Sequence, residues 1–200
     1  TVLSRGLGDV YKRQVRAQYQ EMIAAYEEAG VNVYQSPAEA GLPYQVYARD
    51  SSVMTPWGAI IMQMEKPYRR GEYAAVLRFY LEHGIPIYDI VSAGNVEGGD
   101  FMVLKPGVAM CGYSGERSIE PAVNQLKNWF EAEGWEFMTY AFDPHFLHLD
   151  VQMGMIAEDL AVVCVEAVEP GLVDWLKSKQ IHIMERSYGD TMNMGTNLVA

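Results

Sequence analysis

The segment VEGGDFMVLKPGVAMCGY (residues 96–113) is the clearest of three similar hairpins in this sequence. A short polar run, EGGD, leads into an apolar run that turns at KPG and returns as a second apolar run, which predicts two antiparallel strands. The same order recurs in QVYARDSSVMTPWGAIIM (45–62), with a turn at TPWG, and in LHLDVQMGMIAEDLAVVCV (147–165), with a turn at AED. We therefore predict three hairpins built on one local plan.

Each of these hairpins is followed by an amphipathic helix and then by one more short strand. Apolar residues recur at helical spacing in residues 71–84, 120–134 and 169–180, and a fourth such helix, 18–30, precedes the first hairpin. The strand-like segments that follow the helices are residues 31–35, 85–90, 135–140 and 181–186. The order strand, strand, helix, strand thus recurs about every fifty residues, with a fourth copy beginning at residue 192. The sequence therefore predicts a repetitive α/β fold.

Polar residues interrupt the first strand of each hairpin at matching positions. They are Arg49 and Asp50, then Glu97 and Asp100, then His148 and Asp150, with Asn193 and Gly195 in the fourth copy. On a strand, side chains two residues apart point to the same face, so His148 and Asp150 would lie side by side. Each pair alone is more often an ion pair, a turn or a hydrogen-bonded pair. Repeats around a common axis would bring the equivalent positions together, and this coincidence predicts a functional site.

A site built from Asp50, Glu97 and Asp150 must also hold a positive group, because grouped carboxylates repel one another. A metal ion is one candidate, since three carboxylates and a histidine could bind it. A planar guanidinium is the other, because its N–H donors form paired hydrogen bonds with carboxylates. Arg117, in GYSGERS, would suit the carboxylate of an amino-acid substrate, and its alternative is a surface ion pair with a neighbouring glutamate.

These motifs resemble those of the guanidine-modifying superfamily, which contains arginine deiminases, dimethylarginine dimethylaminohydrolases and amidinotransferases. YARDSSVMTPWG (47–58) is similar to its F-T-R-D-x-x-x-x-T-P-x-G hairpin, and VEGGDFMVL (96–104) to its E-G-G-D strand. GYSGERS (112–118) resembles G-x-x-x-R-[ST], and FLHLDVQMGMIAEDLAVV (146–163) resembles H-L-D-T-x-x-x-x-x-x-x-D-x-A. The resemblance implies the pentein fold, five ββαβ units around a pseudo-fivefold axis, here as an incomplete ring of about three and a half repeats.

The resemblance also implies a hydrolase that cleaves a guanidino C–N bond of arginine or an arginine derivative. The products would be citrulline and ammonia or an alkylamine, formed through a covalent cysteine-thiouronium intermediate. His148 would protonate the departing amine and then activate water, and Glu97 would hold or polarise it. Asp50 and Asp150 would bind the guanidinium nitrogens and fix their orientation.

Three further residues are expected to contact the substrate. Arg117 would bind its carboxylate, Asp100 would add a polar contact, and Tyr47 could pack on the guanidinium plane, although core packing is the more common role for such a tyrosine. The resemblance implies no cofactor and no bound metal, and the expected partner is a small guanidino amino acid. Assembly into a homo-oligomer is left open.

Composition excludes other classes of partner. The chain has 200 residues, of which 50% are hydrophobic, and a formal net charge of −11, which argues against nucleic-acid binding. No apolar run approaches the length of a membrane-spanning helix. The two cysteines, Cys111 and Cys164, lie in apolar context and fit reduced core residues of a cytoplasmic protein.

The sequence departs from the family pattern at both ends. Neither Cys111 nor Cys164 stands in the Gly-rich H-C segment that carries the family nucleophile, so we expect the nucleophile to lie in a C-terminal part that is missing here and the fragment to be inactive. At the other end, SRGLGDVYKRQ (4–14) resembles a translated sequencing adaptor. We therefore expect residues 1–14 to be an artefact or disordered and residues 15–200 to form one truncated domain.

The choice of substrate and reaction depends on few residues. Asp150, in H-x-D, favours a substrate with an unmethylated terminal nitrogen, because such a nitrogen can donate to the carboxylate, whereas dimethylarginine hydrolases often have H-L-K. An amidinotransferase could use the same site if an amine replaced water. A non-catalytic binding protein of the same fold, like the ribosome anti-association factors, is disfavoured by the acid and histidine set. A carboxylate-rich metal site is the fourth alternative.

Overall fold

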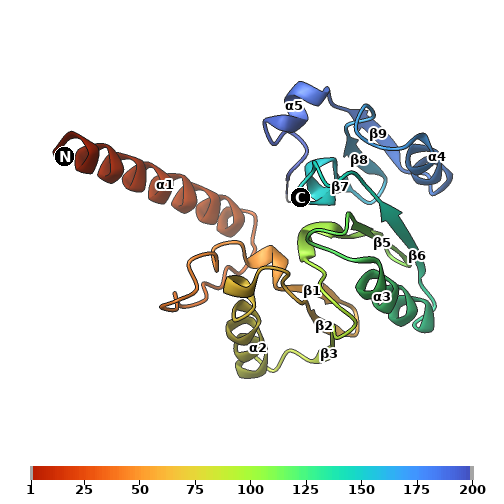
Figure 1. Cartoon of the computed structure of the whole chain (residues 1–200), viewed down its shortest axis with the longest axis horizontal. Helices are drawn as coiled ribbons and strands as arrows, with labels where there is room; N and C mark the ends of the chain where they lie inside the picture. The colour runs from red at the N-terminus through yellow and green to blue at the C-terminus, as the bar shows by residue number, and fades with distance from the viewer. Residues whose placement is uncertain (1, 199–200) are drawn as a thin grey trace. The chain divides into compact units, whose positions relative to one another are not determined.

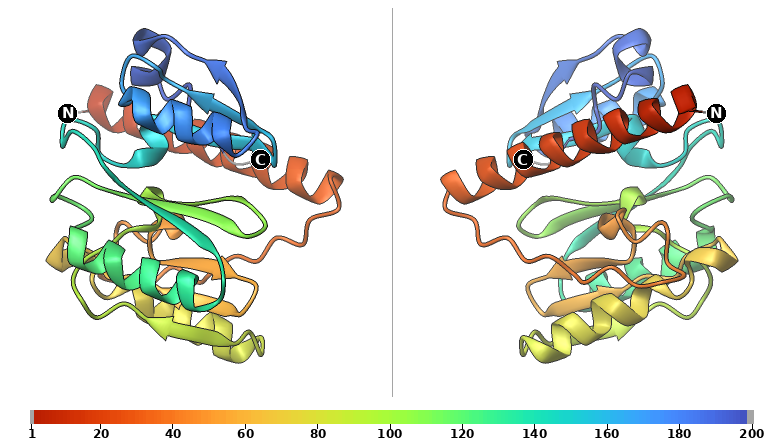
Figure 2. Two further views of the ribbon diagram at one scale, coloured as in Figure 1. Left: turned by 90° about the vertical axis from the view of Figure 1, so that its right-hand side faces the viewer. Right: turned by 90° about the vertical axis from the view of Figure 1, so that its left-hand side faces the viewer.

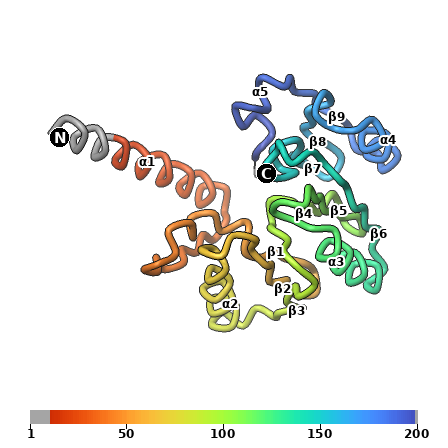
Figure 3. The backbone as a smooth tube through the Cα atoms, viewed as in Figure 1, coloured from red at the N-terminus to blue at the C-terminus, as the bar shows by residue number. Residues whose placement is uncertain are grey.

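The computed structural model describes the backbone of residues 2–198 and the side chains of residues 11–198 (Figure 3). The chain forms two compact units, Thr1–Pro37 and Ala38–Ala200. The first unit is one long helix, α1 (Val2–Glu28), followed by an extended segment. Residues 2–14, which we expected to be an artefact or disordered, form the first half of α1, because no proline interrupts the run as far as Glu28. Residues 31–35 were predicted to be a strand but do not form one, since no strand of the described residues pairs with them.

The second unit contains three ββαβ repeats, as the spacing of the hairpins predicted. The first repeat consists of β1 (Ser52–Thr55), β2 (Gly58–Ile61), α2 (Glu72–Glu82) and β3 (Ile87–Ile90). The second consists of β4 (Phe101–Lys105), β5 (Val108–Tyr113), α3 (Glu120–Ala132) and β6 (Glu136–Ala141). The third consists of β7 (Met153–Ala157), β8 (Leu160–Val163), α4 (Pro170–Ser178) and β9 (His182–Glu185).

Each repeat forms its own three-stranded sheet with the same topology. The first and second strands are antiparallel, and the second and third are parallel, so that the helix is the crossover between parallel strands. Figure 1 shows α2, α3 and α4 on the outer sides of their sheets. In Figure 2 the three repeats follow one another from bottom to top in chain order. The α/β repeat predicted from the sequence is confirmed.

The core of the second unit lies between the helices and their sheets. In α3, Val123, Leu126 and Phe130 are fully buried at the predicted i, i+3, i+7 spacing. In α4, Leu172 and Leu176 take the same place over the third sheet. Burying a large apolar side chain of this kind stabilises the fold by about 1.5–3 kcal/mol. Among the described helices, none has both the length and the apolar content to cross a membrane.

The polar motifs lie on short 3-10 turns that precede the first strands, and this corrects the strand prediction for His148 and Asp150. The turns are η1 (Ala48–Asp50), η3 (Gly98–Asp100) and η4 (Leu149–Val151). Backbone hydrogen bonds close the turns, such as Asp100 N–H to Glu97 O at 3.0 Å and Val151 N–H to His148 O at 3.2 Å. Because η3 contacts both η1 and η4, the three turns still meet.

Two further short helices complete the second unit. The 3-10 turn η2 (Pro67–Arg69) leads into α2 and carries a buried arginine. The helix α5 (Tyr188–Met192) ends at the residue where the sequence predicted the start of a fourth repeat. Residues 193–198 form no strand, and residues 199 and 200 lie outside the described part of the chain.

Candidate active site

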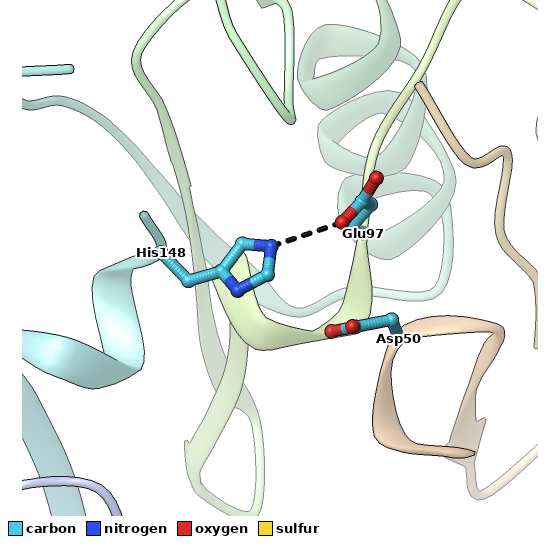
Figure 4. Close-up of side chains that lie close together, drawn as sticks. All are labelled: Asp50, Glu97 and His148. Atoms are coloured by element: carbon cyan, nitrogen blue, oxygen red, sulfur yellow. Dashed lines mark hydrogen bonds and ion pairs between the residues drawn. The ribbon is translucent and has the colours of Figure 1, made fainter. Parts of the chain in front are cut away.

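The site lies where the three turns meet, and its centre consists of Asp50, Glu97 and His148 (Figure 4). One possible ligand atom of each residue, a carboxylate oxygen or a histidine nitrogen, lies within 4.8 Å of the corresponding atoms of the other two. Their side chains come from three different repeats, and all three residues are buried. The structure therefore brings together the three polar runs that the repeat pattern singled out, although the chemical roles of these residues stay predictions.

His148 and Glu97 form a hydrogen-bonded pair, with 3.0 Å between Nε2 and Oε2. Burial lowers the pKa of His148, but the bond to Glu97 and three nearby carboxylates raise it more, so the net pKa is above its usual value. Burial raises the pKa of Glu97, but the bonds from His148 and from the Glu65 N–H leave it below its usual value. The pair therefore favours a protonated imidazole beside an ionised carboxylate, which is the state of a general acid.

Two glycines in η3 let the neighbouring turns approach. A Cβ on Gly98 would lie 2.0 Å from the backbone oxygen of Arg49, and a Cβ on Gly99 would lie 2.7 Å from Nδ1 of His148. Real Cβ atoms do not come this close to other heavy atoms. The EGGD sequence is therefore needed for close packing of η1 and of the histidine ring, beyond the polar groups that it carries.

Arg69 is the positive group among the carboxylates, and the sequence analysis missed it. It is 4% exposed, and its Nη1 lies 2.9 Å from Asp50 Oδ2 and 3.6 Å from Glu97 Oε2. Its Nη2 is 2.9 Å from Glu72 Oε2 at the start of α2. Burial lowers the pKa of Arg69, but the bonds to Glu72 and Asp50 raise it above the usual value. The i, i+3 spacing of Arg69 and Glu72 was the available signal, but it does not reveal that Arg69 is buried while the adjacent Arg70 is exposed.

Tyr47 lies against this arginine, outside the core. It is 57% exposed, so the core packing considered for it is wrong. Its ring centroid lies 5.7 Å from Cζ of Arg69, which is a cation–π distance. The aromatic face therefore meets a guanidinium of the protein itself, and contact with a substrate stays a prediction.

Arg117 also points to Glu97. Its Nη1 lies 3.1 Å from Glu97 Oε2, and its side chain is 17% exposed. The surface ion pair with a neighbouring glutamate is therefore wrong, because the partner is the buried acid of the site. Two guanidinium groups, from Arg69 and Arg117, thus converge on one carboxylate oxygen, and both could meet an anionic group of a ligand.

Asp150 completes the ring of acids from the third repeat. It is 5% exposed, and its Oδ2 lies 3.4 Å from Nε of Arg49 in η1. Burial raises the pKa of Asp150 most, and Arg49 and His148 lower it without cancelling the rise. The carboxylate therefore faces the first repeat, and its binding of a substrate nitrogen stays a prediction.

Asp100 is fully buried, and protein groups bind both of its oxygens. Its Oδ1 accepts the backbone N–H of Leu149 at 2.8 Å, and its Oδ2 accepts the hydroxyl of Ser118 at 2.5 Å. Burial is the main cause that raises the pKa of Asp100 to about 7. Direct contact with a substrate, as predicted from the sequence, would require one of these bonds to open.

The two cysteines are free and buried, as the sequence predicted. Cys111 lies on β5, and Cys164 directly follows β8. Burial raises the pKa of the Cys111 thiol well above its usual value, and the charge of Asp100 adds to the effect. Cys111 is therefore a neutral thiol and does not have the thiolate character that a nucleophile needs.

The central residues are also close enough to share a metal ion. However, the oxygens that would bind it already receive guanidinium groups, Asp50 from Arg69 and Glu97 from both Arg69 and Arg117. A metal ion would have to displace both cations, and it would also need His148 in its neutral form. The positive groups beside these acids thus come from the protein itself, and binding of a substrate guanidinium or of a metal ion stays a prediction.

A separate cavity lies between the end of β6 in the second repeat and the third repeat. It has a volume of about 550 Å³ and is lined by aromatic and acidic side chains, among them Phe142, Phe146, Glu166 and Tyr188. None of the three central residues lines it. We therefore locate the candidate active site at the turns, where the acids, the histidine and the arginines meet.

Comparison with known proteins places this geometry in a family context. A family model described as N,N dimethylarginine dimethylhydrolase, eukaryotic, matches residues 6–200. The uncharacterized protein YkgA of Bacillus subtilis is 27% identical over 192 residues, which are 96% of this chain and 65% of YkgA. An uncharacterized protein of Aeropyrum pernix is 29% identical over 138 residues, which are 64% of this chain and 51% of that protein. The chain thus spans about two thirds or less of these relatives.

Two solved structures have the same fold. The DDAH of Pseudomonas aeruginosa, complexed with citrulline, has a TM-score of 0.74 at 21% identity and is matched over 88% of this chain and 66% of its own. The N-terminal domain of ArgZ, a cyanobacterial arginine dihydrolase, has a TM-score of 0.80 at 17% identity, over 92% of this chain and 68% of its own. The pentein fold is therefore confirmed.

Proposed function

The chain belongs to the N,N-dimethylarginine dimethylhydrolase family, a member of the guanidine-modifying superfamily that its motifs predicted, and on this basis we propose that it carries most of the site of a guanidino amino-acid hydrolase. The observation that carries the proposal is the buried pair of His148 and Glu97 beside Asp50, at the junction of three repeats. The pair provides a proton donor, and Asp50 provides an anionic partner for a guanidinium. P. aeruginosa DDAH and the ArgZ domain, which bind citrulline and substrate in their structures, have the same fold.

In the proposed first step, a cysteine thiolate attacks the guanidinium carbon. A C–S bond forms, the C–N bond to the terminal amine breaks, and the nitrogen leaves with the bonding pair and a proton from His148. Asp50 and Asp150 hold the guanidinium nitrogens, so that the carbon faces the nucleophile. The product of this step is a thiouronium adduct and a free amine.

In the second step, water attacks the same carbon. His148, now neutral, takes a proton from the water while its ring stays bonded to Glu97. The C–S bond then breaks as the carbonyl forms, the thiolate leaves, the remaining hydroxyl proton passes to solvent, and the ureido product, citrulline, is released. Arg117 and Arg69 would bind the substrate carboxylate, since their guanidinium groups lie together beside Glu97.

The nucleophile is the part of the proposal that the described residues do not supply. Cys111 is a buried neutral thiol, and Cys164 is 0% exposed. We propose that the nucleophile comes from a longer form of the protein, and that the 200-residue chain alone is inactive. A cytoplasmic location and the absence of a cofactor also stay predictions.

The test is to express the gene to its own stop codon and to assay the protein. Arginine, monomethylarginine and N,N-dimethylarginine would be supplied in turn, with ammonia, alkylamine and citrulline as readouts. We expect turnover of at least one of them and none after His148→Ala, while His182→Ala on β9, outside the site, should retain activity.

The products distinguish the alternatives. Ammonia from arginine would agree with Asp150 as a partner for an unmethylated nitrogen, and alkylamine would indicate a methylated substrate. Transfer to an added amine would identify an amidinotransferase. No product from any guanidine would rule out the enzyme proposal.

A further inference from the structure

Successive repeats are joined by the same hydrogen bond. Oδ1 of Asp50 accepts the backbone N–H of Gly99 at 3.2 Å, and Oδ1 of Asp100 accepts that of Leu149 at 2.8 Å. In both cases donor and acceptor are 49 residues apart, so the aspartate of one repeat holds the turn of the next. The bond from Asp100 is made to the residue that directly follows His148.

The second oxygen of Asp100 reaches two more parts of the site through Ser118. The hydroxyl of Ser118 donates to Oδ2 of Asp100 at 2.5 Å and accepts the backbone N–H of Glu97 at 3.1 Å. Ser118 also follows Arg117 directly in the chain. One buried carboxyl group is therefore bonded to the backbone next to His148 and to Ser118. Ser118 in turn bonds the backbone of Glu97 and directly follows Arg117.

We propose that Asp100 and Ser118 are positioning residues of the hydrolase: they set the distance between His148 and Glu97 and do not touch the substrate. The inference rests on the proposed function. Both residues are 0% exposed, so neither presents surface to a ligand, whereas Asp50 is 7% exposed. Asp50, the equivalent of Asp100, differs because its second oxygen faces the cation Arg69.

The geometry explains why such a pair would matter. His148 begins η4, and no side chain caps that turn, so the orientation of its backbone depends on what holds Leu149. A shift of about 1 Å in a catalytic group can reduce the rate about a hundredfold. A buried carboxyl group with two fixed bonds restricts such a shift more than a solvated contact would.

The kinetic test compares Asp100→Ala, Asp100→Asn and Ser118→Ala in the active enzyme. We expect Asp100→Ala to lower kcat at least tenfold with little change in KM, and Ser118→Ala to lower it less. Asp100→Asn should recover most of kcat, because the amide oxygen can still accept the Leu149 N–H. A rise in KM with unchanged kcat for all three variants would instead identify Asp100 as a substrate ligand and overturn the proposal.

A second measurement works on the 200-residue chain without any turnover. The ring signals of His148 in NMR spectra are compared with those of the other histidines, His83, His145 and His182, as internal references. We expect Asp100→Ala to shift the His148 signals and Asp100→Asn to shift them much less, with the references unchanged. His148 signals that match the unmodified chain in Asp100→Ala would overturn the proposal.

Thr55→Ala is the matched control for loss of stability. Thr55 is 6% exposed and bonds Gly58 O at 2.7 Å in the first hairpin, outside the site. It should alter neither kcat nor the His148 signals. If the unmodified enzyme turns over no guanidine, the proposed function fails, and the histidine spectra alone then decide whether Asp100 holds His148.

Discussion

Asp50 in η1 and Asp100 in η3 occupy the same place in successive repeats, and each accepts the backbone N–H of the next turn. Their second oxygens differ, because that of Asp50 meets the guanidinium of Arg69 and that of Asp100 meets the hydroxyl of Ser118. The backbone bond is thus the same in both repeats. One neighbouring side chain decides whether the second oxygen of the aspartate meets a cation or an uncharged group. The same position can therefore face a cation in one repeat and an uncharged hydroxyl in another.

The largest effect should follow from removing the cation of the first turn. Arg69→Ala leaves Asp50, Glu72 and Glu97 buried without their partner, so we expect the free energy of unfolding to fall by about 3–5 kcal/mol. Chemical denaturation followed by circular dichroism measures it. Arg78→Ala is the control, since its pair with Glu39 is exposed, and it should change stability by less than about 1 kcal/mol. A loss as small as that of the control would show that Arg69 is not the cation on which the turn depends.

The next prediction compares two glycines of η3. Gly98 packs against the backbone of η1, and Gly99 packs against the ring of His148. Gly98→Ala places a methyl group against the backbone oxygen of Arg49, which cannot move aside easily, so we expect a loss of about 1–3 kcal/mol in unfolding free energy. Gly99→Ala pushes against the ring of His148, so activity should fall more than stability. Gly171→Ala, with open space around it in α4, is the control for both. Equal stability losses in the two variants would contradict this separation.

A smaller effect concerns how the stability of the protein depends on pH through Asp100 in η3. The folded pKa of Asp100, about 7, lies above its ordinary value, so the folded state keeps a proton that the unfolded state has lost. This group therefore lowers the unfolding free energy as pH rises from about 4 to 7, by about 1 kcal/mol per pH unit. Asp100→Asn should remove that part of the slope in denaturation curves measured across the range. Parallel pH profiles for the two proteins would contradict the raised pKa.

The smallest effect should come from the third turn. Arg49 pairs with Asp150 at 3.4 Å, but its side chain is 39% exposed, so solvent screens the pair. We expect Arg49→Ala to lower the unfolding free energy by less than about 1 kcal/mol. Its comparison with Arg69→Ala tests whether burial, rather than the presence of an arginine at the turn, decides how strongly each repeat depends on its cation. Losses of similar size would contradict that.

Much of the fold could be predicted because it depends on local patterns. The stripe of Val123, Leu126 and Phe130 and the repeated hairpins give the α/β order directly. The segment 31–35 was wrongly predicted to be a strand. A strand requires pairing with another strand, and no local sequence pattern shows whether a partner exists. The same limit applies to the 3-10 turns, where strand-like composition around His148 conceals a turn closed by backbone bonds.

The candidate site was predicted as a group and missed in part. Asp50, Glu97 and His148 were found because each repeat carries a polar run at the start of its hairpin, and the need for a positive group among them followed from charge alone. Arg69 was missed because its i, i+3 spacing to Glu72 is a weak local signal, and only the folded chain shows that Arg69 is buried and Arg70 is exposed. Its contact with the exposed ring of Tyr47 could not be predicted for the same reason.

The link between repeats also has a consequence for sequence variation. In each link the acceptor is a side chain, but the donor is a main-chain N–H, of Gly99 or of Leu149. Substitution of the donor residue cannot delete that N–H unless the new residue is proline. The donor of each of these two links is therefore kept by every substitution except proline. A substitution at residue 149 can change the packing while Asp100 still accepts the main-chain N–H.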